Sequence, residues 1–121
     1  MPKKVFIMGA STGIGKALAM HYADQDTILG LAARRVDLLE GVASECRKDN
    51  AKTYVFKVDV TDEENCSKAA HEFIGITGGI DIVIANSGMG SNDDLLSGSS
   101  ERINKILSTN ILGVSNTIIP F

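Results

Sequence analysis

The chain has 121 residues, a formal net charge of −3 at pH 7 and no run of basic residues, so no nucleic-acid-binding surface is expected. This length suffices for one domain with a buried core, and no apolar stretch approaches the roughly 20 residues of a membrane span. An apolar strand pattern begins almost at the N-terminus, which indicates no secretory signal. Cys46 and Cys66 have no metal-ligand spacing, so we expect reduced thiols, no metal site and a cytoplasmic protein.

The first predicted element is a short apolar strand, Val5 to Met8, followed at once by the glycines Gly9, Gly13 and Gly15. A helical pattern then runs to about Ala23. Its inner face is predicted to carry the following side chains: Ile14, Ala17 and Leu18. A strand, a glycine turn and a helix N-terminus together form an anion site, because free backbone N–H groups and the helix dipole point at the turn. Glycine there permits close approach of a phosphate.

Three motifs compete for this glycine segment. A P-loop requires Gly-x-x-x-x-Gly-Lys-Ser/Thr, but Ala10 and Ala17 stand where its first Gly and its Ser or Thr belong. The common dinucleotide fingerprint Gly-x-Gly-x-x-Gly does not fit the spacing either. The observed spacing is Gly-x-x-x-Gly-x-Gly, and a plain strand-to-helix turn is the purely structural alternative.

Strands and helices alternate along the rest of the chain. Thr61 to Glu64 reads as a capping box that opens a helix. The other predicted elements are a strand over 27–33, a helix over 36–48, a strand over 53–58, a helix from 63, a strand over 80–85, a polar loop over 87–100 and one long helix over 101–119. This alternation is typical of an α/β fold with a parallel sheet covered by helices on both faces.

Right-handed crossovers then give a Rossmann-like, doubly wound parallel sheet with strand order 3-2-1-4. Ligands of such sheets bind outside the carboxyl ends of the strands at the switch point, here between the first and fourth strands. The loops Gly9 to Gly15 and Asn86 to Gly90 are therefore expected to face the same crevice.

The second strand ends in Ala33-Arg34-Arg35. An acidic residue near this point would bind the ribose hydroxyls of NAD, whereas an arginine accommodates the 2′-phosphate of NADP. Asp37 is a rival acid, but Asp is ordinary in the first turn of a helix. The structural alternative for both arginines is a solvated strand end. We predict NADP as the cofactor, with NAD as the second choice.

The glycine segment resembles the cofactor loop of the short-chain dehydrogenase/reductase family, Thr-Gly-x-x-x-Gly-x-Gly, with Met8 in place of the Thr. Other segments of the chain are similar to family elements in the same order: Val58-Asp59-Val60, Ala85-Asn86-Ser87-Gly88 (Asn-Asn-Ala-Gly in the family) and Asn110-Ile111-Leu112-Gly113 (Asn-x-x-Gly). The resemblance covers the chain from Met1 to Phe121. It implies that residues 1–121 form the NAD(P)-binding Rossmann portion of such a protein, truncated before the fifth strand that continues the sheet in the family.

By this resemblance, Asp59 accepts a hydrogen bond from the exocyclic amine of adenine. The family often has a second basic residue where Thr12 stands, so the preference for NADP depends mainly on Arg34. The cofactor-binding residues implied are Gly9, Ser11, Thr12, Gly13, Ile14, Gly15, Arg34, Arg35, Asp59, Val60, Asn86, Ser87 and Gly88.

The family's chemistry uses a Ser and a Tyr-x-x-x-Lys pair, and this sequence contains no Tyr-x-x-x-Lys pair. Its tyrosines are Tyr22 and Tyr54, followed four residues later by Asp26 and Val58. Only Asn110 remains of the implied catalytic set. Because hydride transfer needs a proton partner near the reacting oxygen, we expect this chain alone to be inactive.

Two hypotheses follow. The chain is the cofactor-binding part of an NADP-dependent oxidoreductase acting on a small carbonyl or alcohol, or it is a non-catalytic dinucleotide-binding or interaction module complete at 121 residues. An unpaired edge at Asp81 to Ala85 and an apolar face on the final helix predict a homo-oligomer.

Overall fold

The computed structural model describes residues 2–86 and 98–121. Strands and helices alternate along these residues as the sequence predicts. The elements are β1 (Lys3–Met8), α1 (Gly13–Tyr22), β2 (Thr27–Ala33), α2 (Val36–Lys48), β3 (Lys52–Lys57), α3 (Glu63–Thr77), β4 (Ile82–Ala85), α5 (Ser100–Leu107), the π-helix η1 (Ser108–Leu112) and α6 (Gly113–Ile118). In this part of the chain, no helix combines the length and the apolar character that crossing a bilayer requires.

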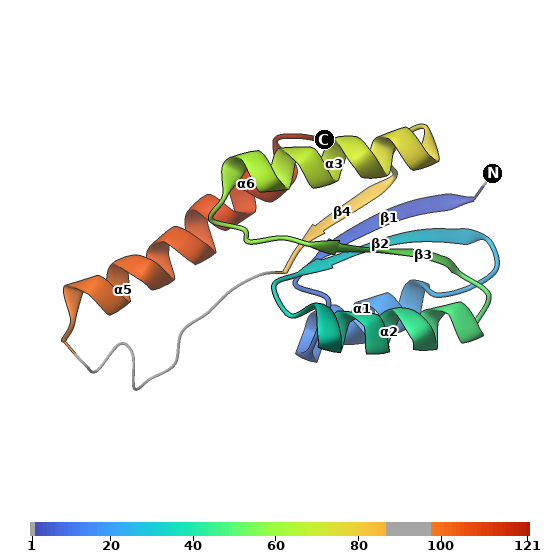
Figure 1. Cartoon of the computed structure of the whole chain (residues 1–121), viewed down its shortest axis with the longest axis horizontal. Coiled ribbons are helices and arrows are strands. Elements are labelled where there is room, and N and C mark those ends of the chain that lie inside the picture. Colours follow the sequence, from blue (N-terminus) through green and yellow to red (C-terminus); the bar gives the residue numbers. More distant parts are fainter. Residues whose placement is uncertain (1, 87–97) are drawn as a thin grey trace.

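The strands form one parallel sheet in the order β3-β2-β1-β4, which confirms the predicted α/β fold and strand order. The central strand β1 pairs on both sides, with Val5 opposite Leu29 of β2 and Ile82 of β4. Because helices cover both faces, the central strands read as continuous apolar runs. Figure 1 shows α1 and α2 on one face and α3 and α6 on the other.

The face covered by α1 and α2, here called the α1/α2 face, is packed with aliphatic side chains. Leu29 and Leu31 of β2 and Leu39 of α2 are fully buried in it. Cys46 lies in the same cluster and is a free thiol. The amphipathic pattern of α2 predicts this packing correctly, since its buried residues follow a helical period.

The opposite face, here called the α3/α6 face, is packed with aromatic rings. The Phe6 ring lies 5.4 Å from that of Phe73 and 5.0 Å from that of Phe121, between ring centroids. Gly30 makes room for them, because a Cβ at that position would lie 2.7 Å from Cδ2 of Phe6. The absence of a side chain at Gly30 is therefore a packing requirement of this cluster.

The predicted inner face of α1 is correct for Leu18, which packs against the aliphatic core, and wrong for Ile14 and Ala17. Gly15 and Ala19 are buried, whereas Ile14 is 71% exposed and Ala17 is also exposed. The reason is close approach: a Cβ on Gly15 would lie 1.9 Å from the Gly9 carbonyl oxygen. Small residues therefore approach the sheet most closely, and hydrophobicity alone misplaces the first turn of this helix.

The start of α3 also differs from the prediction. Asp62, rather than Thr61, is the N-cap, and its carboxylate accepts from the backbone N–H of Asn65 at 3.0 Å. The Thr61 hydroxyl instead donates to the Asp59 carboxylate at 2.6 Å. Both residue types cap helices well, and the turn after β3 decides between them.

The final helix is not the single α-helix that the sequence predicts. The π-helical η1 separates α5 from α6, and Figure 1 shows α5 projecting beyond the sheet while α6 lies beside α3. After this change of phase, Gly113 packs against Val60, where a Cβ would lie 3.0 Å from Cγ2. The Asn116 side-chain amide donates to the Val60 carbonyl at 2.9 Å. These contacts fasten α6 to the loop between β3 and α3.

Candidate functional site

The glycine segment forms a tight turn between β1 and α1. Gly9 and Gly13 have positive φ angles of 85° and 58°, which glycine adopts without strain. Met8, which stands where the family has a Thr, is the last residue of β1 and is buried. A Cβ on Gly13 would meet no atom of the described residues within 4 Å, so the space beside it is open. The turn therefore presents backbone, without side-chain bulk, to a ligand.

Asn86 braces this turn from the neighbouring strand. Its side-chain amide donates to the Gly9 carbonyl at 3.3 Å, and its backbone N–H donates to the Met8 carbonyl at 3.0 Å. The first residue after β4 thus reaches the first glycine after β1, as the predicted strand order requires. Ser87 and Gly88, which follow Asn86, lie outside the described residues.

The N-terminus of α1 has the properties of an anion site. The N-cap residue Thr12 makes no side-chain capping bond, and the first turn contains no acidic residue. The leading N–H groups and the positive end of the helix dipole are thus available to a negative group. Thr12 and Ile14 are exposed and Ser11 is half-buried on this rim. The residues present therefore fit a bound pyrophosphate.

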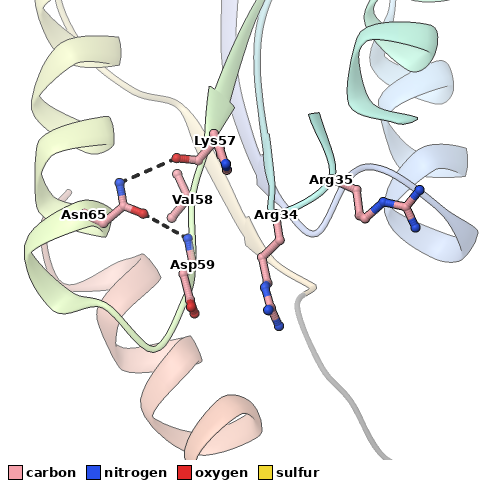
Figure 2. A pocket seen from close by; sticks show the side chains of 6 residues that line it. All are labelled: Arg34, Arg35, Lys57, Val58, Asp59 and Asn65. Carbon is pink, nitrogen blue, oxygen red and sulfur yellow. Dashed lines mark hydrogen bonds between the residues drawn. The ribbon is translucent and has the colours of Figure 1, made fainter. Parts of the chain in front are cut away.

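A second part of the site is a pocket of about 850 Å³ at the carboxyl ends of β2 and β3 (Figure 2). Because β1, β2 and β3 are parallel, this pocket and the glycine turn lie along the same edge of the sheet. The lining residues are Arg34, Arg35, Lys57, Val58, Asp59 and Asn65.

The two arginines in this pocket differ in their partners. Arg35 forms an ion pair with Asp37 at 3.0 Å, and this contact raises the pKa of Arg35 and lowers that of Asp37. Arg34 is exposed and makes no ion pair with any residue that the structure describes. Figure 2 shows Arg34 directed to the same side as Asp59, whereas Arg35 turns away. Arg34 is therefore the guanidinium that the pocket offers to an anion.

The Asp59 carboxylate is held in place by Thr61. Its Oδ1 accepts from the Thr61 backbone N–H at 3.0 Å and from the Thr61 hydroxyl at 2.6 Å. These bonds lower the pKa of Asp59, and the charge of Arg34 adds to the effect. The carboxylate is thus a charged acceptor, and its Oδ2 receives no hydrogen bond from a described residue. Val58 lines the pocket beside it, while Val60 is buried against Gly113.

Sequence reasoning missed two pocket residues, Lys57 and Asn65. Lys57 ends β3, where a lysine reads as an ordinary strand end. Asn65 stands three residues after the N-cap Asp62, the position at which a capping box has Glu or Gln. The signal in the sequence is therefore an Asn at the position where a capping box has Glu or Gln, because the shorter side chain is free to bind a different main-chain segment.

The single predicted catalytic residue, Asn110, is not among the residues that line this pocket. Asn110 is in η1, and π-helical turns occur frequently at functional sites. His21 and His71 are exposed on α1 and α3, in agreement with their interpretation as solvated side chains. Tyr22 and Tyr54 pack partly against the two cores.

Residues 3–119 match the sequence profile of a family described as short chain dehydrogenase. An uncharacterized oxidoreductase of Listeria monocytogenes is 34% identical over 116 residues, which are 96% of this chain and 47% of the relative. A short-chain type dehydrogenase/reductase from Mycobacterium marinum is 36% identical with a TM-score of 0.90, over 98% of this chain and 48% of that one. The chain thus spans about half the length of the curated relatives it matches.

Two structural neighbours carry different cofactors. An alcohol dehydrogenase from the archaeon Thermococcus sibiricus, complexed with 5-hydroxy-NADP, is 32% identical with a TM-score of 0.87, over 100% of this chain and 52% of that one. A NAD⁺-bound xylitol dehydrogenase has a TM-score of 0.91 at 24% identity, over 98% of this chain and 46% of that one. The second likeness shows the fold alone, so the neighbours leave the choice of cofactor to the residues of the pocket.

Proposed function

The chain belongs to the short-chain dehydrogenase/reductase family, and from this premise we propose that it is the NADP-binding part of an oxidoreductase. When bound, NADP supplies the nicotinamide ring that gives or takes a hydride. The substrate class is a small carbonyl compound or alcohol. Because the chain spans about half the length of its relatives, this activity is proposed for the assembled enzyme.

The glycine segment would bind the pyrophosphate. The residues proposed for this contact are Gly9, Ser11, Thr12, Gly13, Ile14 and Gly15. Their backbone N–H groups and the dipole of α1 favour a negative group at the turn, and the missing Cβ atoms allow it to come close. Asn86 would keep the Gly9 carbonyl turned away from the phosphates through its 3.3 Å bond. Ser87 and Gly88 remain proposed contacts.

The observation that carries the preference for NADP is the unequal pairing of the two arginines. Arg34 makes no ion pair with a described residue, so it can form a charge-assisted pair with a 2′-phosphate without giving up a protein contact. Arg35 is a weaker candidate, because phosphate binding would have to compete with Asp37. Asp59 would accept from the exocyclic amine of adenine, and Val60, whose side chain is buried against Gly113, would contribute only main-chain groups beside it.

The test is a fluorescence titration of the chain with NADPH and NADH. The wild type should favour NADPH by about 1–3 kcal/mol, or roughly 5- to 150-fold, the value of a charge-assisted hydrogen bond. Arg34→Ala should remove most of this preference, and Arg35→Ala should keep most of it. Equal affinities in the wild type, or an unchanged preference in Arg34→Ala, would refute the assignment.

A second test concerns catalysis. The sequence has no Tyr-x-x-x-Lys pair, and Asn110 by itself provides no proton donor of suitable pKa. The purified chain should therefore consume no NADPH above background on a panel of aldehydes and ketones. Turnover that disappears in Tyr22→Phe or Tyr54→Phe would contradict this expectation and give those tyrosines a role.

A non-catalytic dinucleotide-binding module is the second candidate, and residues 1–121 by themselves are compatible with either function. The nucleotide sequence after codon 121 separates the two, because the oxidoreductase requires that pair downstream. We also propose a cytoplasmic, homo-oligomeric protein. The support for the homo-oligomer is the outer edge of β4, unpaired within the described sheet, and the exposed apolar side chains of η1 and α6.

A further inference from the structure

Asn65, in the first turn of α3, holds the end of β3 by two hydrogen bonds (Figure 2). Its Oδ1 accepts from the backbone N–H of Asp59 at 2.9 Å, and its Nδ2 donates to the carbonyl of Lys57 at 3.5 Å. Asp62 caps the backbone N–H of Asn65 itself at 3.0 Å, so the helix start fixes where this amide lies. The side chain therefore joins α3 to the strand end.

The amide takes the place of a neighbouring strand. The last bond from this segment to β2 is the Val58 N–H to the Ala33 carbonyl, at 3.0 Å. The groups on either side, the Lys57 carbonyl and the Asp59 N–H, point to the outer edge of β3, where the described sheet has no further strand. A side-chain amide offers one acceptor and one donor in the geometry of a peptide group. Asn65 thus satisfies both groups and fixes the main chain beyond the end of the strand.

Fixing this main chain fixes the carboxylate of Asp59. Thr61 occupies Oδ1, so the direction of Oδ2 depends on the backbone at Asp59. That side chain lies in the pocket of about 850 Å³, on the same side as Arg34. Asn65 also lines this pocket, but its own donor and acceptor are used by the main chain.

We propose that Asn65 is a positioning residue for base recognition: it orients Asp59 so that Oδ2 selects a purine with an exocyclic amine. The proposal rests on the dinucleotide-binding function put forward above. An amine donates to the carboxylate, whereas the keto oxygen of hypoxanthine opposes it. Loss of Asn65 should therefore lower selectivity for the base while the 2′-phosphate contact at Arg34 remains.

The bond itself is tested without any cofactor, by amide hydrogen exchange followed by NMR. In Asn65→Ala the exchange of the Asp59 amide should speed up at least tenfold, while amides of α2 stay unchanged. Asn65→Asp keeps the acceptor for Asp59 and should retain most of the protection. Asn116→Ala is the matched control, since it removes a side-chain amide bond to Val60 in the same loop but leaves the Asp59 bond. An unchanged Asp59 amide in Asn65→Ala, or equal loss in the control, would overturn the proposal.

Base selectivity is tested by titrating NADPH against its hypoxanthine analogue. The wild type and Asn116→Ala should prefer NADPH by tenfold or more, Asn65→Ala by less than threefold, and Asn65→Asp by an intermediate factor. A full preference in Asn65→Ala overturns the positioning role alone, because the wild type then still binds NADPH. Failure of the wild type to bind either nucleotide overturns both this role and the proposed function.

Discussion

The two faces of the sheet are covered in different ways. On the α1/α2 face, two helices that connect consecutive strands bury a closed aliphatic core. On the α3/α6 face, an aromatic cluster is shared between α3 and the C-terminal residue Phe121. Beside it, the last helical segments carry large apolar side chains that are exposed: Leu107, Ile111, Leu112, Val114, Ile118 and Ile119.

The difference shows how sequence separation affects closure. Each helix of the α1/α2 face packs on strands adjacent to it in the chain, so a short crossover suffices to bury its apolar side. The α3/α6 face requires α6 to return from a distant part of the sequence to the loop at Val60. Its packing therefore depends on a few long-range contacts, and it leaves an apolar surface available for association.

The largest expected effect on stability comes from a substitution that disrupts the aromatic packing of the α3/α6 face. Phe73→Ala removes a fully buried ring that lies 5.4 Å from Phe6 and 6.1 Å from Phe56, and it should cost about 3–5 kcal/mol of unfolding free energy. Urea unfolding measures this cost. Ile76→Ala, on the exposed side of the same helix, should cost less than about 1 kcal/mol. Equal costs would mean that the aromatic cluster contributes no more than the surface of α3.

An intermediate effect concerns association. Ile111 and Ile119 are 62% and 78% exposed, so replacing both by lysine should leave the monomer's stability within about 0.5 kcal/mol. It should weaken self-association at least tenfold, as measured by sedimentation velocity, because two charges would be buried on contact. Leu38→Lys on the α1/α2 face is the control and should change nothing. A monomeric wild type at micromolar concentration would rule out association through this surface.

The smallest expected effect is a difference in alkylation rate between two thiols, one on each face of the sheet. Burial is the main cause that raises the pKa of Cys46 on the α1/α2 face and of Cys66 on the α3/α6 face to about 11. Both should therefore react slowly with iodoacetamide at pH 8. In single-cysteine variants made with alanine, we expect Cys66 to react several-fold faster, because the α3/α6 face opens more readily. Equal alkylation rates for the two thiols would show that the two faces open equally readily, contrary to this prediction.

The sign of the pH dependence follows from the same shift. An unfolded thiol has a pKa of about 8.5, below the folded value of about 11. The contribution of each thiol to stability is therefore fully present below pH 8.5 and is lost as the pH rises toward 11. Thermal unfolding between pH 7 and 10 should show a falling midpoint, and Cys46→Ala should reduce the slope.

The sequence by itself determined the elements whose signals are local. Apolar runs and a helical period predicted β2 and α2 with the boundaries that the structure has. Right-handed crossovers then gave the strand order, and the glycine spacing located the turn between β1 and α1. These features follow from propensity, periodicity and chain connectivity, and all three can be read from residues that are close together in the sequence.

Only the tertiary structure decided which face of α1 is buried, where the last helix changes phase and which arginine is paired. Gly15 faces the sheet because the Gly9 carbonyl leaves no room for a Cβ, and this is a distance between atoms rather than a pattern. Asn65 binds the end of β3 because the described sheet has no strand on that side. The Asn116 to Val60 bond spans 56 residues of sequence. Such contacts form only when the chain closes, so no local period encodes them.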